Sequence, residues 1–384
     1  MAGPLFPRPT RAHNPYGQSV DKADYDGGLM PLDVLDRARL VVVTGKGGTG
    51  KTTVAAALAV AAAQRGRRTL VAEVEGRQGL SALFGRATLG HRETELAERV
   101  NGLAVEPEAS LREYLGRYGF APLARLLSWA RLTSFVTAAA PGLGDILLVG
   151  KVWEAATRRA GQRRVYDLVV LDAPPTGRVV PFLRAPETVA ELARVGPLRH
   201  QADRVKDLLD DPERTAVLLT CLPEELPVTE TIEAAVSLRA AELPLAAVVV
   251  DQVAEDRLAS RAGRLPALAR DPAPLLAAAS EAGAGLDEQA LATLLGEARD
   301  RQRQIARERR LLKELRTRLH GLPVVELPLL AGGAASPEAV RALAARLALS
   351  PLAGQPPDEA GGLRADGRGR PPPSAPEREA RARR

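Results

Sequence analysis

Short apolar runs alternate with longer stretches of helical character along most of the chain. The runs are continuous in apolar character, and they predict strands at 40–44, 69–74, 168–172, 216–220, 246–251 and 324–327. Continuous apolar strands are typical of sheets that helices cover on both faces, and strands that alternate with helices favour parallel pairing. The pattern therefore predicts an α/β fold with a doubly wound, mostly parallel sheet.

Two stretches break this alternation and predict a helical insertion subdomain, at about 106–160 and at 187–210. Farther along, residues of about 286–319 predict one long polar helix. Leu312, Leu315 and Leu319 would lie on one face of it and arginines on the opposite face.

The two ends of the chain differ in composition from the part between them. Residues 1–36 and 351–384 are rich in proline and glycine, and neither carries enough apolar residues to bury a core. We predict one folded domain over 37–350 between a disordered N-terminal extension, 1–36, and a disordered Pro/Gly/Arg-rich tail, 351–384. Met1 and Met30 are the only methionines, which suggests that translation begins at Met30.

Composition narrows the class of protein. Apolar residues make up 45% of the chain but aromatic residues only 3%, so the core must consist mainly of Ala, Val and Leu. The single cysteine, Cys221, excludes an internal disulfide and fits a reducing compartment. The formal charge is +6, and the seven arginines and three acids of 361–384 account for most of it, so no nucleic-acid partner is expected.

The longest apolar run, 54–63, is shorter than the roughly 20 residues that a membrane-spanning helix needs. No transmembrane segment is therefore expected. The chain is predicted to be cytoplasmic, with peripheral attachment to a membrane as a second option.

A glycine-rich loop carries the clearest chemical signal. Residues 45–52 read Gly-Lys-Gly-Gly-Thr-Gly-Lys-Thr, between the predicted strand 40–44 and a predicted helix. This context is that of a phosphate-binding P-loop, in which backbone N–H groups and the helix N-terminus surround phosphate oxygens. Lys51 is expected to reach the β- and γ-phosphates, and Thr52 to bind Mg²⁺. The predicted ATP-binding residues of this segment are Gly45, Lys46, Gly47, Gly48, Thr49, Gly50, Lys51, Thr52 and Thr53.

Asp172 ends the predicted strand 168–172 and is followed by Ala-Pro-Pro-Thr-Gly at 173–177. Parallel strands present their carboxyl ends at one edge of a sheet, so this carboxylate would lie near the P-loop. We predict that Asp172 is the Walker B acid, which holds Mg²⁺ through water. The turn that follows it would be a switch that senses the γ-phosphate.

Lys46 is a second lysine inside the loop, and a generic P-loop does not need it. The pattern Lys-Gly-Gly-x-Gly-Lys-Thr-Thr over 46–53 resembles the deviant Walker A group, in which this lysine crosses a dimer interface to the partner's nucleotide. The resemblance implies a dimer in which Lys46 supplies the charge that an arginine finger supplies elsewhere.

The whole set of motifs resembles the ArsA/Get3 family of anion-transporting or tail-anchored-protein-targeting ATPases. The second family motif, Asp-Thr-Ala-Pro-Thr-Gly, is similar to residues 172–177. Residues 140–142 with Asp145, and 223–224 with Glu230, follow in the family's order. The resemblance covers about 40–350 and implies a Mg²⁺-dependent P-loop ATPase. In this family, ATP binding and hydrolysis drive delivery of a client protein or work on a membrane partner.

Further site residues are implied by the same resemblance. Glu75 stands where the family has its water-positioning Asp, and it is taken as catalytic together with Lys46, Lys51 and Asp172. Asp251 matches the family's base-recognition Asn. Pro328 and Leu329 match a later landmark, and they are expected with Asp251 at the ATP.

The sequence also departs from the family. The interface cysteines that clamp zinc and the arsenite-binding cysteines are both absent, and no methionine follows Met30 to build a client groove. Glu75-Gly76 and the Ala/Arg-rich composition are most similar to the actinobacterial branch. Members of that branch often occur as two adjacent paralogues, so the expected partner is a second copy or a paralogous ATPase. The client or membrane partner stays unidentified.

Two other functions remain open at this stage. One is a positioning ATPase of the ParA/MinD kind, which shares the lysine-marked loop. The other is a weakly hydrolysing structural subunit paired with an active paralogue, because Glu75 and Asp251 both depart from the family pattern.

Overall fold

The computed structural model describes residues 36–74, 78–117, 143–192, 197–257, 263, 265–333 and 335–348. Contacts divide the chain into residues 1–353 and 354–384, and every described residue belongs to the first unit. The predicted disorder at 1–36 and 351–384 lies, apart from residue 36, outside the described residues. It stays a prediction, as does the start at Met30.

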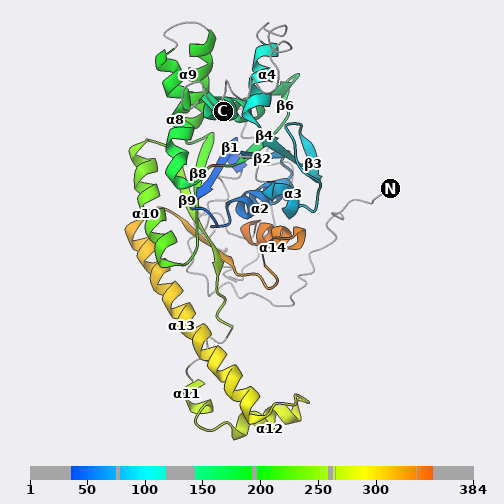
Figure 1. Cartoon of the computed structure of the whole chain (residues 1–384), viewed down its shortest axis with the longest axis vertical. Coiled ribbons are helices and arrows are strands. Elements are labelled where there is room, and N and C mark those ends of the chain that lie inside the picture. Colours follow the sequence, from blue (N-terminus) through cyan, green and yellow to red (C-terminus); the bar gives the residue numbers. More distant parts are fainter. Residues whose placement is uncertain are drawn as a thin grey trace, which may run out of the picture. The chain divides into compact units, whose positions relative to one another are not determined.

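An eight-stranded sheet forms the centre of the described chain (Figure 1). Its order is β10-β9-β8-β1-β7-β2-β4-β3, and all neighbours pair in parallel except β3 and β4. The central strands are β1 (Leu40–Gly45), β7 (Leu168–Asp172), β2 (Thr69–Val74) and β8 (Thr215–Cys221). The outer strands are β9 (Leu245–Val253), β10 (Val324–Pro328), β4 (Val100–Val105) and β3 (Thr94–Ala97). The predicted α/β fold with a mostly parallel sheet is confirmed.

All six strands predicted from apolar runs are present, within two residues at each end. Strands β3 and β4 were missed. The segment of β3 begins with exposed Thr94 and Glu95, and the apolar run of β4 is interrupted by Asn101 and Gly102.

Helices cover both faces of the sheet. On one face, α2 (Lys51–Gln64), α3 (Gly79–Leu83) and α14 (Pro337–Ala348) share one apolar cluster with the strands. The other face packs against α7 (Leu143–Thr157), α8 (Thr176–Leu192), α9 (Pro197–Asp210), α10 (Glu225–Ala240) and one end of α13 (Glu288–Arg318). Helix α2 is buried almost all round, and six of its alanines are fully buried. Small side chains let it lie close to the sheet, as expected of a core built from Ala, Val and Leu.

The region of the predicted insertion contains α4 (Pro107–Arg117) and α7 before the short hairpin β5 (Arg159–Ala160) and β6 (Arg163–Arg164). Residues 118–142 between these helices lie outside the described residues, so the bounds of the insertion stay a prediction. The long helix predicted over 286–319 is confirmed as α13, with Leu312, Leu315 and Leu319 buried. Two short helices precede it, α11 (Leu265–Leu268) and α12 (Ala273–Glu281). No helix in the described part of the chain has the length and apolar character needed to cross a bilayer.

Candidate nucleotide-binding site

The P-loop connects the end of β1 with the start of α2, in the middle of the sheet. The neighbouring strand β8 contacts and supports this loop. A Cβ built on Gly45 would lie 2.2 Å from Oγ1 of Thr220, and the hydroxyls of Thr49 and Thr220 are hydrogen-bonded at 2.7 Å. Thr220 is therefore a structural support of the loop that the motif alone did not reveal.

The outer part of the loop is open. Gly47 and Gly48 are exposed, and a Cβ built on either residue would meet no atom within 4 Å. Helix α2 begins without a side-chain cap on its first N–H groups and without an acidic residue in its first turn. Uncapped N–H groups and the positive end of the helix dipole together suit an anion. The loop therefore fits a phosphate group.

Three further side chains lie in or beside the loop. Lys51 is buried, and its Nζ donates to the carbonyl of Lys46 at 3.1 Å. The hydroxyl of Thr52 donates to Oδ2 of Asp172 at 2.6 Å, at the end of the adjacent strand β7. A hydroxyl and a carboxylate are oxygen donors of the kind that Mg²⁺ takes. Thr52 and Asp172 can thus hold Mg²⁺ beside the loop.

The segment after Asp172 is tied to the strand of the P-loop. Thr44, near the end of β1, donates through Oγ1 to the carbonyl of Pro174 at 2.7 Å. Helix α8 begins two residues later at Thr176. Arg178 in its first turn pairs with Asp145 of α7 at 3.2 Å. The ion pair Arg178–Asp145 therefore links the conformation of this turn to α7.

Lys46 forms an ion pair with a residue of α10. Its Nζ lies 2.6 Å from Oε1 of Glu230 on α10, and each side chain is about one-third exposed, at 34% and 32%. In this arrangement the lysine is held at the surface by an ion pair within the same chain.

Glu75, the predicted catalytic carboxylate, lies outside the described residues. A different carboxylate in the same segment is well placed: Glu73, buried within β2, accepts hydrogen bonds from the backbone N–H groups of Gln78 at 3.0 Å and Leu80 at 3.1 Å. A Cβ built on Gly79, between them, would lie 2.9 Å from Cγ2 of Thr52. Glu73 thus holds this segment against the site. A charged residue inside an apolar strand was the signal that could have revealed it, because a buried charge needs partners.

Asp251 lies within β9 directly under the P-loop, and it is 1% exposed. Its Oδ1 accepts from the backbone of Gln252. Its Oδ2 is buried without a hydrogen-bond partner among the described residues, 2.3 Å from where a Cβ on Gly50 would be. Burial raises the pKa of Asp251 to about 6, although the N–H of Gln252 opposes the shift. The sequence predicted that this strand ends at Asp251, but β9 continues to Val253.

Pro328 and Leu329 lie beside the end of that strand. Pro328 pairs with Val253, whose carbonyl accepts from the backbone of Leu329 at 2.9 Å. Leu329 is 41% exposed. The structure therefore brings both residues to β9, the strand that carries Asp251. In the sheet, β8 lies between β9 and β1, the strand that leads into the P-loop.

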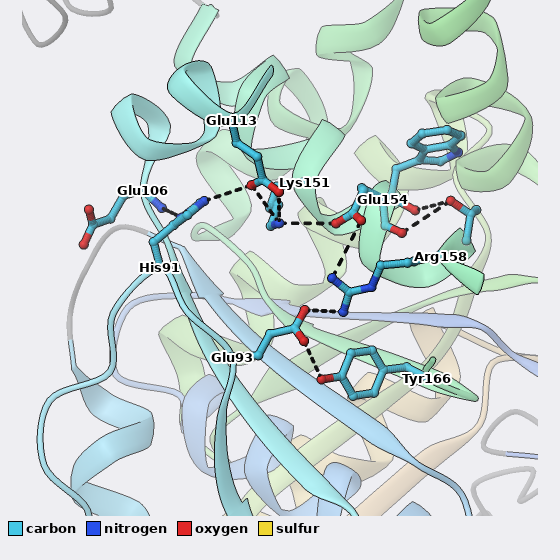
Figure 2. A network of polar contacts seen from close by, with 10 residues as sticks. His91, Glu93, Glu106, Glu113, Lys151, Glu154, Arg158 and Tyr166 are labelled. Atoms are coloured by element: carbon cyan, nitrogen blue, oxygen red, sulfur yellow. Dashed lines mark hydrogen bonds and ion pairs between the residues drawn. The ribbon is translucent and has the colours of Figure 1, made fainter. Parts of the chain in front are cut away.

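Charged contacts join α4 with α7 and tie the end of α7 to Glu93, the residue before β3 (Figure 2). Lys151 of α7 donates to both oxygens of Glu113 on α4, at 2.8 and 3.0 Å. Arg158, just after α7, pairs with Glu93, which also accepts from the hydroxyl of Tyr166 at 2.8 Å. Burial, aided by Glu93, raises the pKa of Tyr166 to about 12, so this hydroxyl stays a donor. These contacts add to the apolar packing of α7 on the sheet.

Comparison with known proteins agrees with this geometry. The anion-transporting ATPase family matches residues 38–203 and 192–267. A protein of Mycobacterium tuberculosis (strain H37Rv), ATPase BagA, is 44% identical over 225 residues, which are 57% of this chain and 66% of the relative. ATPase GET3 of Kluyveromyces lactis is 24% identical over 252 residues, 56% of this chain and 72% of the relative.

The match to the family covers more than half of the chain. A P-loop on a mostly parallel sheet and these relatives together define the class: this is a P-loop NTPase of the α/β type. The chain belongs to the anion-transporting ATPase family, the ArsA/Get3-type ATPases. Membership implies that it binds nucleotide. The matched part spans just under two-thirds of the mycobacterial relatives.

Proposed function

We propose that this chain hydrolyses Mg·ATP at loop 45–52 as one half of a dimer. The helices of the insertion would move with the state of that site, and so deliver a client protein or drive a membrane partner. The observation that carries the proposal is the combination of an open P-loop with a Lys46 whose ammonium group is paired with Glu230 of α10.

The binding of Mg·ATP is assigned to side chains around the loop. Lys51, which donates to the carbonyl of Lys46, would bind the β- and γ-phosphates, and Thr52 with Asp172 would hold the metal ion. Bound Mg²⁺ supplies charge neutralisation on the phosphate oxygens. Asp251, Pro328 and Leu329 are proposed to border the base. Glu75 is proposed to orient the attacking water.

The dimer is inferred from the ion pair of Lys46 with Glu230. Its Nζ is engaged on the surface of its own chain, so within one protomer it does not support the phosphates that the loop would hold. An ion pair whose side chains are only partly buried contributes modest free energy, on the order of 1 kcal/mol. A partner's nucleotide, with its several negative charges, can therefore compete with Glu230 for the lysine. We propose that this exchange accompanies dimer formation.

Coupling to the insertion is assigned to the pair Arg178–Asp145, which joins the turn after Asp172 to α7. A turn that changes when the γ-phosphate is lost would pull on α8 and α7 together. That supports a nucleotide-driven movement of the insertion helices.

The test is a Lys46→Ala variant. It should keep Mg·ATP binding, measured by fluorescent-nucleotide titration, and lose most of its turnover. The loss should be at least tenfold, since charge supplied in trans contributes about 10³–10⁵ in related enzymes. Lys206→Ala on α9 is a matched control, because it removes a surface lysine that pairs with Asp210 and should leave turnover unchanged. Unchanged turnover in Lys46→Ala would remove the argument for a shared site.

A further inference from the structure

A row of arginines runs along one exposed face of α13. Its members follow one another at spacings of four, four and three residues, and all are exposed: Arg299, Arg303, Arg307 and Arg310. At about 100° and about 1.5 Å per residue, the row stays within an arc of about 80° and is about 17 Å long. We call these four residues the arginine row.

The charge of the row is only weakly balanced within the described residues. Asp300 pairs with Arg303 at 3.0 Å, but both side chains are more than 70% exposed, at 74% and 79%. Glu225 lies 3.9 Å from Arg310, at the limit of an ion pair. Pairs this exposed hold side chains weakly. By helical spacing, Glu314, one turn after Arg310, is the one acid of α13 that falls within the arc of the row, so the stretch from Arg299 to Arg310 remains a positive strip.

An apolar helix lies near the first turns of α13, which precede the arginine row. The sequence of α12 is Ala-Pro-Leu-Leu-Ala-Ala-Ala-Ser-Glu, yet none of its residues is buried. Leu275 and Leu276 are partly buried against Leu291 and Leu295 of α13, and Figure 1 shows α12 beside the first turns of that helix. The other face of α12 leaves Ala277 and its neighbours exposed. The exposed apolar side chains of α12 are thus small ones.

We propose that the arginine row and α12 together form a surface that docks on an anionic lipid bilayer. A bilayer interface takes both components, since its headgroups attract arginine and its acyl boundary accepts apolar side chains. Single-stranded nucleic acid would favour aromatic side chains for base stacking, and residues 265–318 contain none. A second copy of the chain would set arginine against arginine if the rows faced each other.

This surface lies on a different element from the P-loop, and docking through it requires no hydrolysis. The inference therefore goes beyond the proposed ATPase cycle. Failure of one leaves the other standing.

The test is co-sedimentation of the full chain with vesicles, in physiological salt and without nucleotide. Vesicles of phosphatidylcholine are compared with vesicles that contain equal parts of phosphatidylglycerol. Each arginine near an anionic surface contributes about fivefold to partition, so the row predicts about 10³-fold stronger binding to the anionic vesicles. Equal binding to both vesicle types, or binding to neither, overturns the proposal.

A pair of charge-matched variants locates the surface. The first reverses Arg299, Arg303 and Arg307 to Glu, and it should lose at least about 100-fold in binding to anionic vesicles. The second reverses three exposed arginines elsewhere, Arg159, Arg163 and Arg239, and it should lose far less. Both keep the arginine-rich segment 361–384, and their thermal unfolding confirms that they fold. Equal losses in the two variants would mean that binding follows total charge, and the assignment would be wrong.

Two further measurements separate the alternatives. Ala277→Glu places a charge on the exposed face of α12 and should weaken vesicle binding. Unchanged binding would exclude α12 from the surface and overturn that half of the proposal. A DNA duplex and an oligonucleotide are titrated in the same salt, with no binding expected. If the wild type binds DNA but not vesicles, and reversal of the row abolishes it, the surface belongs to nucleic acid and the lipid proposal falls.

Discussion

Gly50 is the residue at which the P-loop turns into α2, and it has a φ of 80°. In this left-handed region a side chain costs about 1–2 kcal/mol. A Cβ here would also lie 2.3 Å from Oδ2 of Asp251, which β9 holds in place. We predict that Gly50→Ala lowers the free energy of unfolding by at least about 2 kcal/mol, measured by urea denaturation. It should also weaken ATP binding.

Gly47→Ala is the matched control for this prediction. Gly47 is exposed, has open space where its Cβ would be, and is not among the positive-φ glycines. Its substitution should change the free energy of unfolding by no more than about 0.5 kcal/mol. Equal losses of unfolding free energy in the two variants would contradict the requirement for glycine at position 50 that its positive φ and the contact with Asp251 imply.

Asp251 itself makes stability depend on pH. Burial raises its pKa from an ordinary 3.8 to about 6, so between these values the folded chain holds more protons than the unfolded chain. Stability is therefore greatest below the lower value and falls as pH rises through the higher one. The shift corresponds to a loss on the order of 3 kcal/mol. We predict that Asp251→Asn removes this loss.

Urea unfolding of the wild type and of Asp251→Asn between about pH 4 and about pH 7 would check it. The Asn variant should gain stability relative to the wild type as the pH rises. Parallel stability profiles for the two proteins would contradict a buried, proton-binding carboxylate at this position.

Among the elements, the central strands were predictable because helices bury them on both faces. That burial forces continuous apolar runs, such as Val41–Val43 in β1. The edge pair was not predictable on that basis. Gly102 of β4 is opposite Thr94, and a Cβ there would lie 2.5 Å from Cδ1 of Leu96. The glycine that breaks the run in sequence is thus required by the packing of the pair.

The candidate site also has a part that the sequence predicts and a part that it does not. The loop and Asp172 follow from local motifs, and the structure places Thr52 and Asp172 in contact. The supports from distant strands do not follow from any local motif. Thr220 is 171 residues from Thr49, and Glu230 is 184 residues from Lys46. Such pairs depend on strand order, which periodicity does not determine.

The pair Asp145–Arg178 links α7 with α8, directly after the turn that follows Asp172. We predict that Asp145→Asn leaves ATP affinity unchanged within about twofold, because the side chain belongs to α7, not to loop 45–52, and its pair with Arg178 is partly exposed. It should reduce the nucleotide-dependent change in amide exchange along α7, which hydrogen-exchange mass spectrometry measures. Glu338→Gln removes a comparable exposed pair with Arg341 on α14 and is the control. A wild-type exchange response in Asp145→Asn would break the proposed link.

For the whole molecule, the arrangement of the two loop lysines argues for a shared site. Lys51 is buried and donates to a carbonyl of its own loop, while Lys46 pairs with Glu230 of α10. In the proposed dimer, Lys51 would meet the protomer's own phosphates and Lys46 those of the partner. Nucleotide should therefore act as part of the interface, and dimer formation should depend on it.

We predict that the mass of the 40.7 kDa chain in solution doubles when a slowly hydrolysed Mg·ATP analogue is added, measured by light scattering. Mg·ADP should not support the dimer, because the γ-phosphate is the group that Lys46 would reach across the interface. Doubling for the chain alone indicates a homodimer. Doubling only in a mixture with a paralogous ATPase indicates a hetero-oligomer, and turnover confined to that mixture would make this chain the supporting subunit. If the mass stays that of one chain in every case, Lys46 has no partner to reach, and its contact with Glu230 is structural.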